Sequence, residues 1–265
     1  MNVTIRAMDY SNLLVDRSER VARVILNRPD RRNALSLELL NELHGALMDI
    51  GNDAEIAAVV IEGAGPVFSS GHDLNEMIDR DHSFYSALFD RCTDVMLEIQ
   101  ALRQPVIAKV HGVATAAGCQ LVAACDLAVA ALDSRFATPG VRIGLFCSTP
   151  MVPISRAIGR KRALEMLLTG EPIDATTALE WGLVNRVVSE PQLEAAVQQL
   201  VAQITRFSSE VIAIGKEAFY AQVDADQAQA YAITAPIMTA NAVHHDAQEG
   251  MAAFLEKRDP KWGIA

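Results

Sequence analysis

Short apolar segments alternate with helical patterns over the first two thirds of the chain, and this alternation limits the fold more than any other feature. Apolar runs rich in Val, Ile and Ala predict strands at residues 20–29, 57–62, 104–112 and 127–132. Between the first two runs, residues 36–51 have leucines at helical spacing and predict an amphipathic helix, with Ser36 as its N-cap. Strands that alternate with helices are typical of an α/β domain.

The pattern changes near residue 190. The segments 191–207, 208–222 and 246–258 predict helices, and no further strand pattern follows. We therefore divide the chain into a core at residues 1–190 and a helical C-terminal region at residues 191–265.

Charge and cysteine content limit the class of protein. The net charge of −10 argues against binding to nucleic acid, which needs a basic face. No apolar run has the length of a membrane span, and the first residues do not have the pattern of a signal peptide. The four cysteines form no C-x-x-C pair, so we expect reduced thiols. These features predict a soluble cytoplasmic protein, or one of the mitochondrial matrix in a eukaryotic cell.

Two segments carry residues that a simple turn would not need. "FSSGHDLNE" (68–76) follows the strand at 57–62, and "VATAAGCQLVAACD" (113–126) leads from a strand into a short apolar helix. Small residues allow a ligand to touch the backbone, and N–H groups at a helix N-terminus favour negative charge. We infer a ligand site between these segments. The alternative for the second segment is a tightly packed turn into a buried helix.

Further motifs follow in a recognisable order. They are "FATPGVRIGLFCS" (136–148), "ALEMLLTGEPIDATTALEWGLVNRVV" (163–188) and "GMAAFLEKRDPKW" (250–262). Together with "SSGHD" and "AAGCQLVA", they resemble the crotonase superfamily, the enoyl-CoA hydratase/isomerase family. The resemblance runs from about residue 13 to the end of the chain.

The resemblance implies a fold, a ligand and an assembly. The fold is an α/β spiral of repeated ββα units with a helical C-terminal trimerisation region, and the assembly is a homotrimer or a dimer of trimers. The substrates are acyl-CoA thioesters, so coenzyme A enters as part of the substrate and no cofactor is bound permanently. We expect no metal site and no nucleic acid or membrane partner.

In this family, two backbone N–H groups bind the thioester carbonyl, and they correspond to His72 and Ala117, near the start of a helix that we expect to begin at about Gly118. Fixed donors of this kind stabilise the negative charge of an enolate. Losing one typically costs roughly 2.7–4 kcal/mol of transition-state stabilisation.

The sequence departs from the family at both positions where hydratases carry a glutamate. These positions hold Gln120 and Gly140, which cannot exchange a proton near neutral pH. We expect ordinary hydration to be weak. Because "SGHD" also occurs in the methylmalonyl-CoA decarboxylase branch, an acyl-CoA decarboxylase-like reaction using His72 is one alternative. That branch has a tyrosine close to the position of Cys147, which this sequence lacks. The other alternative is a non-catalytic acyl-CoA-binding or regulatory protein.

Two side chains in the site have open roles. His72 either takes part through its imidazole or is a spectator whose backbone acts. Cys147 either lines the pocket or acts as a nucleophile, which requires a base to form the thiolate.

The resemblance also indicates where coenzyme A binds. The loop "NRPDRRNAL" (27–35) offers arginines for phosphate groups, although it also fits a solvated charge run. The predicted binding residues are Arg31, Ala34, Leu35, Ser70, Asp73 and Leu74, with Phe254 and Lys257 from the C-terminal segment, often of a neighbouring subunit.

Overall fold

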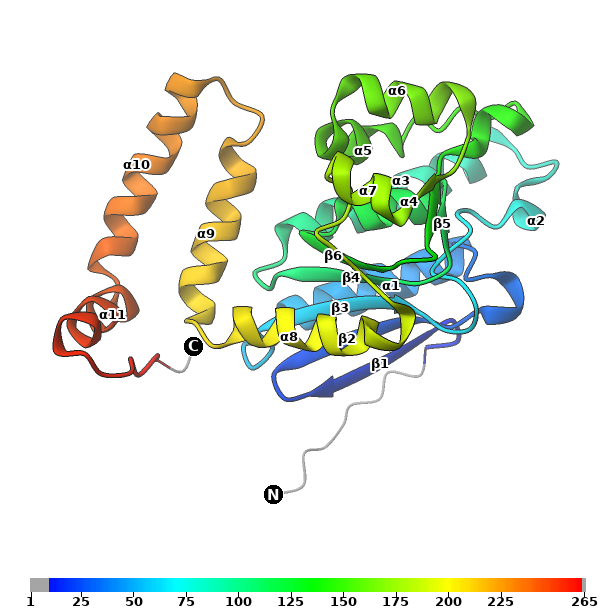
Figure 1. Cartoon of the computed structure of the whole chain (residues 1–265). Helices are drawn as coiled ribbons and strands as arrows, with labels where there is room; N and C mark the ends of the chain where they lie inside the picture. Colours follow the sequence, from blue (N-terminus) through cyan, green and yellow to red (C-terminus); the bar gives the residue numbers. More distant parts are fainter. Residues whose placement is uncertain (1–9, 264–265) are drawn as a thin grey trace.

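The structure is a computed structural model that describes residues 10–263. Its main sheet has the strand order β1-β2-β3-β4-β6-β9 (Figure 1). The strands are β1 (Leu13–Ser18), β2 (Val21–Leu26), β3 (Ala58–Gly63), β4 (Val106–Val110), β6 (Leu127–Ala131) and β9 (Arg186–Val188). β1 and β2 are antiparallel, and all other neighbours are parallel. The four predicted strands are present, but β2 ends at Leu26, three residues before Pro29.

A second, smaller sheet contains β5 (Val113–Thr115), β7 (Arg135–Ala137) and β8 (Ile173–Asp174). The chain passes from β4 in the main sheet to β5 in the small sheet through His111 and Gly112. Gly112 has φ +58°, and an added Cβ would lie 2.3 Å from the Pro66 carbonyl oxygen. β6 and β7 are divided between the sheets in the same way. A helix follows each of these strand pairs, so the predicted spiral of ββα units is confirmed.

The core helices surround the two sheets (Figure 1). They are α1 (Leu37–Gly51), α2 (Leu74–Met77), α3 (His82–Ala101), α4 (Ala117–Ala124), α5 (Met151–Ile158), α6 (Arg160–Thr169) and α7 (Ala175–Trp181). Some of them pack mainly on other helices, as α3 does on α1. Ser36 caps α1 as predicted, since its side chain accepts a hydrogen bond from the Leu39 N–H. α4 begins at Ala117, within one residue of the predicted start near Gly118. Short 3₁₀ turns span Pro29–Arg31, Pro139–Ile143 and Glu190–Gln192.

Alternate residues of the main sheet contact different helices. In β3, Val59 and Ile61 belong to the large core under α1 and α3. Their neighbours Ala58 and Val60 contact α8 (Leu193–Thr205) on the opposite face. This period of two is what a strand buried on both faces requires, and it explains why β3 is apolar over nearly its whole length.

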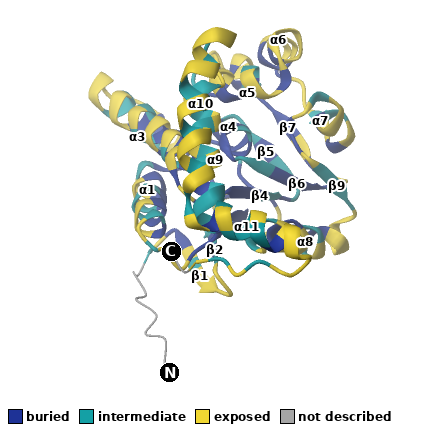
Figure 2. Ribbon diagram, turned by 90° about the vertical axis from the view of Figure 1, so that its left-hand side faces the viewer, coloured by how far each residue is buried: buried dark blue, intermediate teal, exposed yellow. Residues whose placement is uncertain are grey.

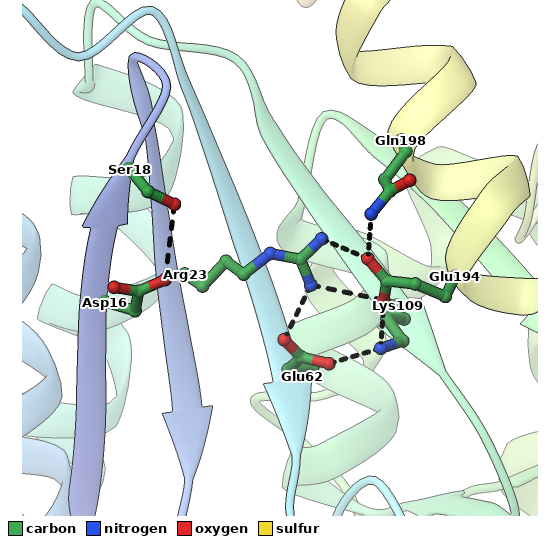
Figure 3. A network of polar contacts seen from close by, with 7 residues as sticks. All are labelled: Asp16, Ser18, Arg23, Glu62, Lys109, Glu194 and Gln198. Atoms are coloured by element: carbon green, nitrogen blue, oxygen red, sulfur yellow. Dashed lines mark hydrogen bonds and ion pairs between the residues drawn. The ribbon is translucent and has the colours of Figure 1, made fainter.

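Ion pairs also connect α8 to the sheet (Figure 3). Glu194 of α8 and Glu62 of β3 both bond Arg23 of β2 and Lys109 of β4. The Lys109 Nζ to Glu62 Oε2 distance is 2.6 Å. Burial lowers the pKa of Lys109, but the two carboxylates outweigh burial and raise it. The two positive and two negative charges therefore neutralise one another where α8 contacts the sheet.

Three helices follow α8 and extend away from the sheets (Figure 1). They are α9 (Ser209–Gln222), α10 (Gln227–Val243) and α11 (His245–Glu256), here called the C-terminal arm. α10 contains no Asp, Glu, Lys or Arg and has no buried residue, and Figure 2 shows its largely exposed surface. The last described strand is β9, so the predicted boundary near residue 190 coincides with a change to helices; that division into regions stays a prediction.

Within residues 10–263, no helix is both long enough and apolar enough to cross a membrane. The same part of the chain contains no group of three or more His, Cys, Asp or Glu side chains that would hold a metal ion.

Candidate functional site

One cavity of about 720 Å³, here called the main cavity, lies where the predicted motifs meet. Three segments contribute most of its wall: the loop 30–34, the segment 70–77 and the segment 139–150. The predicted residues on the wall are Arg31, Ala34, Ser70, His72, Asp73, Leu74, Ala117, Gly140 and Cys147. The described wall does not include Leu35, Gln120, Phe254 or Lys257.

Gly71 allows the loop after β3 to lie against the start of α4. Its φ is +88°, a conformation that residues other than glycine rarely adopt. An added Cβ would stand 2.8 Å from the Cβ of Ala116, 2.9 Å from the Thr115 oxygen and 3.2 Å from the Ala117 nitrogen. The glycine of "SSGHD" is therefore required by close contact between two segments distant in the sequence.

The backbone N–H groups of His72 and Ala117 donate no hydrogen bond to any described residue. Their neighbours are bonded: the Gly71 N–H to Ser69 Oγ, the Asp73 N–H to the Leu35 oxygen, and the Ala116 N–H to the Ala137 oxygen. Ala117 is the first residue of α4, where an N–H has no partner within the helix. Two unbonded donors thus lie on the wall of the same cavity.

Ala116 has an unusual backbone conformation directly before α4, with φ 49° and ψ −119°. Such conformations cost of order 1–3 kcal/mol in a non-glycine residue and are concentrated at functional sites. Here the conformation sets the direction in which the following Ala117 N–H points. Neither the sequence around "TAAG" nor its small residues predict this conformation.

The His72 side chain is folded away into packed surroundings. Its Nδ1 lies 3.3 Å from the Leu35 carbonyl oxygen, and since a carbonyl only accepts, Nδ1 carries the proton. The ring contacts Phe89 edge-on at 5.4 Å between centroids. Nε2 is buried and has no partner among the described residues. Burial lowers the pKa of His72 to about 4, so the imidazole is neutral at neutral pH.

Asp73 has a structural role in the loop. Its carboxylate accepts from Arg28 Nη2 at 2.9 Å and from the Asn75 N–H at 3.1 Å, and it caps α2. Burial favours the protonated form, but these bonds outweigh it and hold the pKa of Asp73 below its usual range. Arg28 also donates to the Ala34 carbonyl. Arg28 therefore holds the loop 27–35 together, and Arg31 and Arg32 remain on the cavity wall.

The two positions that the resemblance assigns to glutamates have different surroundings. Gln120 is buried on α4, and its Oε1 lies 3.9 Å from the Cys92 Sγ. Gly140 has no room for a side chain, because an added Cβ would lie 2.0 Å from the Leu145 oxygen. The same Cβ would lie 2.8 Å from the Cys147 Sγ. Burial raises the pKa of the Cys147 thiol, which opposes formation of the thiolate that a nucleophile needs.

The two predicted C-terminal residues lie outside the main cavity. Phe254 is 82% exposed and borders a second cavity of about 490 Å³ within the C-terminal arm. Lys257 ends α11 in a left-handed conformation, with φ 57°. A single copy of the chain does not bring them to the main cavity, so their part in binding coenzyme A stays a prediction about an assembly.

Several wall residues were not predicted as site residues. Phe89 of α3, Met77, Leu145 and Phe146 all line the main cavity. Phe89 and Met77 had no local signal, since apolar residues at helical spacing are ordinarily core. Leu145 and Phe146 lie inside "GLFCS", where only the cysteine was singled out.

Comparison with known proteins supports the motif order. The family described as enoyl-CoA hydratase/isomerase matches residues 16–264. The mitochondrial enoyl-CoA hydratase domain-containing protein 3 of Mus musculus is 46% identical over 243 residues, which are 91% of this chain and 81% of that protein. A probable enoyl-CoA hydratase of Mycobacterium tuberculosis is 32% identical over 256 residues, covering 96% of this chain and 99% of that protein.

Solved structures agree with the fold. The enoyl-CoA hydratase of Mycobacterium smegmatis has a TM-score of 0.93 and 50% identity, and the alignment covers 95% of this chain and 98% of that one. The human enoyl-CoA hydratase domain-containing protein 3 has a TM-score of 0.93 and 44% identity, over 95% of this chain and 100% of that one. The chain is thus similar to the domain-containing protein 3 type, and it belongs to the enoyl-CoA hydratase/isomerase family of the crotonase superfamily.

Proposed function

We propose that this protein binds acyl-CoA thioesters in the main cavity and stabilises a thioester enolate with the backbone N–H groups of His72 and Ala117. The observation that carries the proposal is the pair of unbonded donors on one cavity wall, one of them at the first residue of a helix. Donors fixed by the fold need no reorganisation when negative charge develops on the acyl oxygen. The reaction class is that of a lyase or isomerase acting on CoA thioesters.

Ordinary hydration of an enoyl-CoA is expected to be slow. Each positioned acid or base contributes on the order of 10²–10⁴ in rate, and the two usual carboxylate positions hold Gln120 and Gly140. Decarboxylation is the second candidate. It is favoured by the same observation, because loss of carbon dioxide leaves an enolate directly and needs the two donors but no general base.

Assembly completes the proposed site. We propose a homotrimer or a dimer of trimers, in which a neighbouring copy covers α10 and carries Phe254 and Lys257 toward bound coenzyme A. The uncharged, unburied α10 supports this, since such a surface is costly to leave in water. Coenzyme A arrives as part of the substrate, and no permanently bound cofactor is needed. The compartment proposed is the cytoplasm, or the matrix in a eukaryote, as the names of mitochondrial relatives suggest.

A panel of thioesters tests the proposed function. The protein is incubated with crotonyl-, malonyl- and methylmalonyl-CoA, and binding and turnover are measured separately. Binding of the panel with slow crotonyl-CoA hydration supports the proposal, and turnover of a malonyl-type thioester supports the second candidate. Hydration as fast as that of ordinary hydratases contradicts the expectation that Gln120 and Gly140 make hydration slow. Binding without any turnover leaves an acyl-CoA-binding protein, and failure to bind any thioester overturns the whole proposal.

A further inference from the structure

A cluster of largely buried polar groups, here called the latch, joins the C-terminal arm to the core and consists of Lys216, Tyr220 and Asp126. Lys216 and Tyr220 of α9 both bond Asp126, which lies between α4 and β6. The distance is 2.6 Å from Lys216 Nζ to Asp126 Oδ2 and 2.7 Å from the Tyr220 hydroxyl to Asp126 Oδ1. The Lys216 side chain is only 7% exposed. Because taking charges out of water costs desolvation energy, such a pair is explained better by the geometry that it fixes than by added stability.

Lys216 holds the ends of three core elements together. Besides Asp126, its Nζ donates to the carbonyl oxygens of Ile99 at 2.8 Å and of Gln104 at 2.9 Å, so all three donors of the ammonium group are used. Ile99 lies in the last turn of α3, where carbonyl groups lack a partner within the helix, and Gln104 lies just before β4. Asp126 also accepts the Val106 N–H at 2.6 Å. One ammonium group of the arm therefore binds the C-terminal end of α3, the residue after α4 and the start of β4.

The helices α3 and α4 also place the two proposed thioester donors. Ala117 is the first residue of α4, and seven of the eight residues of this short helix are buried, so it moves as a unit. α3 carries Phe89, whose ring contacts the His72 ring edge-on. Phe89 and Ala117 both line the main cavity. The N-terminal parts of the two helices thus lie at the cavity, while their C-terminal ends meet at Lys216.

We propose that Lys216 and Tyr220 are positioning residues for the thioester site, and that docking of the C-terminal arm through the latch sets the direction of the Ala117 N–H. The inference rests on the proposed function. Release of the latch leaves the C-terminal end of α4 without its anchor, and the Ala117 donor then turns away from the acyl oxygen. α9 lies between the core and α10 (Figure 1), the helix that a neighbouring copy is proposed to cover. Assembly and alignment of the donor pair are therefore coupled, since whatever favours the docked arm favours the aligned site.

Infrared spectroscopy of bound butyryl-CoA, labelled with ¹³C at its carbonyl, tests this positioning. In the unmodified protein, two donors lower the wavenumber of the carbonyl stretch. Tyr220→Phe should return the stretch part of the way toward that of the free thioester, and Lys216→Met should return it further. Tyr231→Phe, a matched change at an exposed tyrosine of α10, should leave the stretch unchanged. An unchanged stretch in Tyr220→Phe and Lys216→Met overturns the inference; if Lys216→Met does not fold, Tyr220→Phe alone decides.

A further control separates positioning from general stability. Val197 of α8 is fully buried in the core cluster on the α8 face of the sheet and takes no part in the latch. Val197→Ala should lower the free energy of unfolding and leave the carbonyl stretch unchanged. A stretch that follows stability in every variant, Val197→Ala included, overturns the inference. If no thioester binds, or the unmodified protein binds one with the stretch of the free thioester, the proposed function itself has failed, so the two failures are distinguishable.

Discussion

Gly140 lies so close to Leu145 that a Cβ added at position 140 would stand 2.0 Å from the Leu145 carbonyl oxygen. The position at which the family resemblance places a second glutamate is therefore not simply empty. The chain itself fills it, with Cys147 Sγ also 2.8 Å from the same point. The absence of a side chain at position 140 and the folding of segment 145–147 over it are two aspects of one local arrangement.

A methyl group at position 140 should destabilise the fold. Gly140→Ala forces the Leu145 carbonyl or the Cys147 thiol to move, and overpacking of this kind typically costs about 1–3 kcal/mol. Urea unfolding measures the change in the free energy of unfolding. Gly45→Ala is the control, since a Cβ at Gly45 has nothing within 4 Å; alanine there should stabilise α1 by up to about 1 kcal/mol. Equal changes in the free energy of unfolding for both variants would show that position 140 is not crowded.

Restoring both carboxylates should not create a hydratase. In the double variant Gln120→Glu with Gly140→Glu, the second side chain cannot enter the space that Leu145 fills. Crotonyl-CoA hydration, followed by loss of the enoyl thioester absorbance, should stay within tenfold of the unmodified protein. A gain of about 10²–10⁴, the usual contribution of a positioned acid or base, would mean that the segment moves aside readily.

His72 should make stability dependent on acid pH. The pKa of the buried imidazole is lowered from 6.5 to about 4, whereas the unfolded chain binds this proton near pH 6.5. Between these values the unfolded state holds more protons, so the free energy of unfolding decreases as pH falls, by up to about 3 kcal/mol. His72→Gln should reduce this slope, and His82→Gln, at an exposed position, should not. If the unmodified protein and both variants lose stability equally as the pH falls, His72 is not a buried neutral imidazole.

Lys216 should be essential for docking the C-terminal arm. Its Nζ donates to Asp126 Oδ2 at 2.6 Å and to the carbonyl oxygens of Ile99 and Gln104. Lys216→Met leaves the partly buried Asp126, whose side chain is 14% exposed, without its counter-charge; for a fully buried pair this typically costs about 3–5 kcal/mol, which is the upper limit expected here. Adding Asp126→Asn should recover part of this loss. Lys161→Met, on the exposed surface of α6, should change unfolding by no more than about 0.5 kcal/mol.

The sequence predicted what depends on local pattern and failed where distant segments meet. Apolar runs predicted the strands of the main sheet that lie in its middle, and Ser36 predicted the start of α1, because burial and capping are written in neighbouring residues. The strain at Ala116 and the crowding at Gly140 could not be predicted. Each arises from contact with a segment whose position is known only after folding.

For the candidate site too, local motifs could be predicted and contacts between distant segments could not. The predicted residues His72, Ala117 and Gly140 line one cavity, and their roles stay predictions. Two apolar residues of the cavity wall were missed, since Met77 and Phe89 are indistinguishable in sequence from ordinary core residues. The pairing of Lys216 with Asp126 was also missed, because the two residues are 90 positions apart.

The central claim is that the N–H groups of His72 and Ala117 bind one acyl oxygen, and infrared spectroscopy of a bound thioester tests it directly. A saturated acyl-CoA labelled with ¹³C at its carbonyl is measured free and bound, so that the carbonyl stretch is seen apart from the protein. Two donors should shift the stretch of the bound thioester to lower wavenumber. Gly71→Ala, which drives the loop away from Ala116, should reduce that shift in whatever ligand remains bound. A bound thioester with the carbonyl stretch of the free one would contradict the claim.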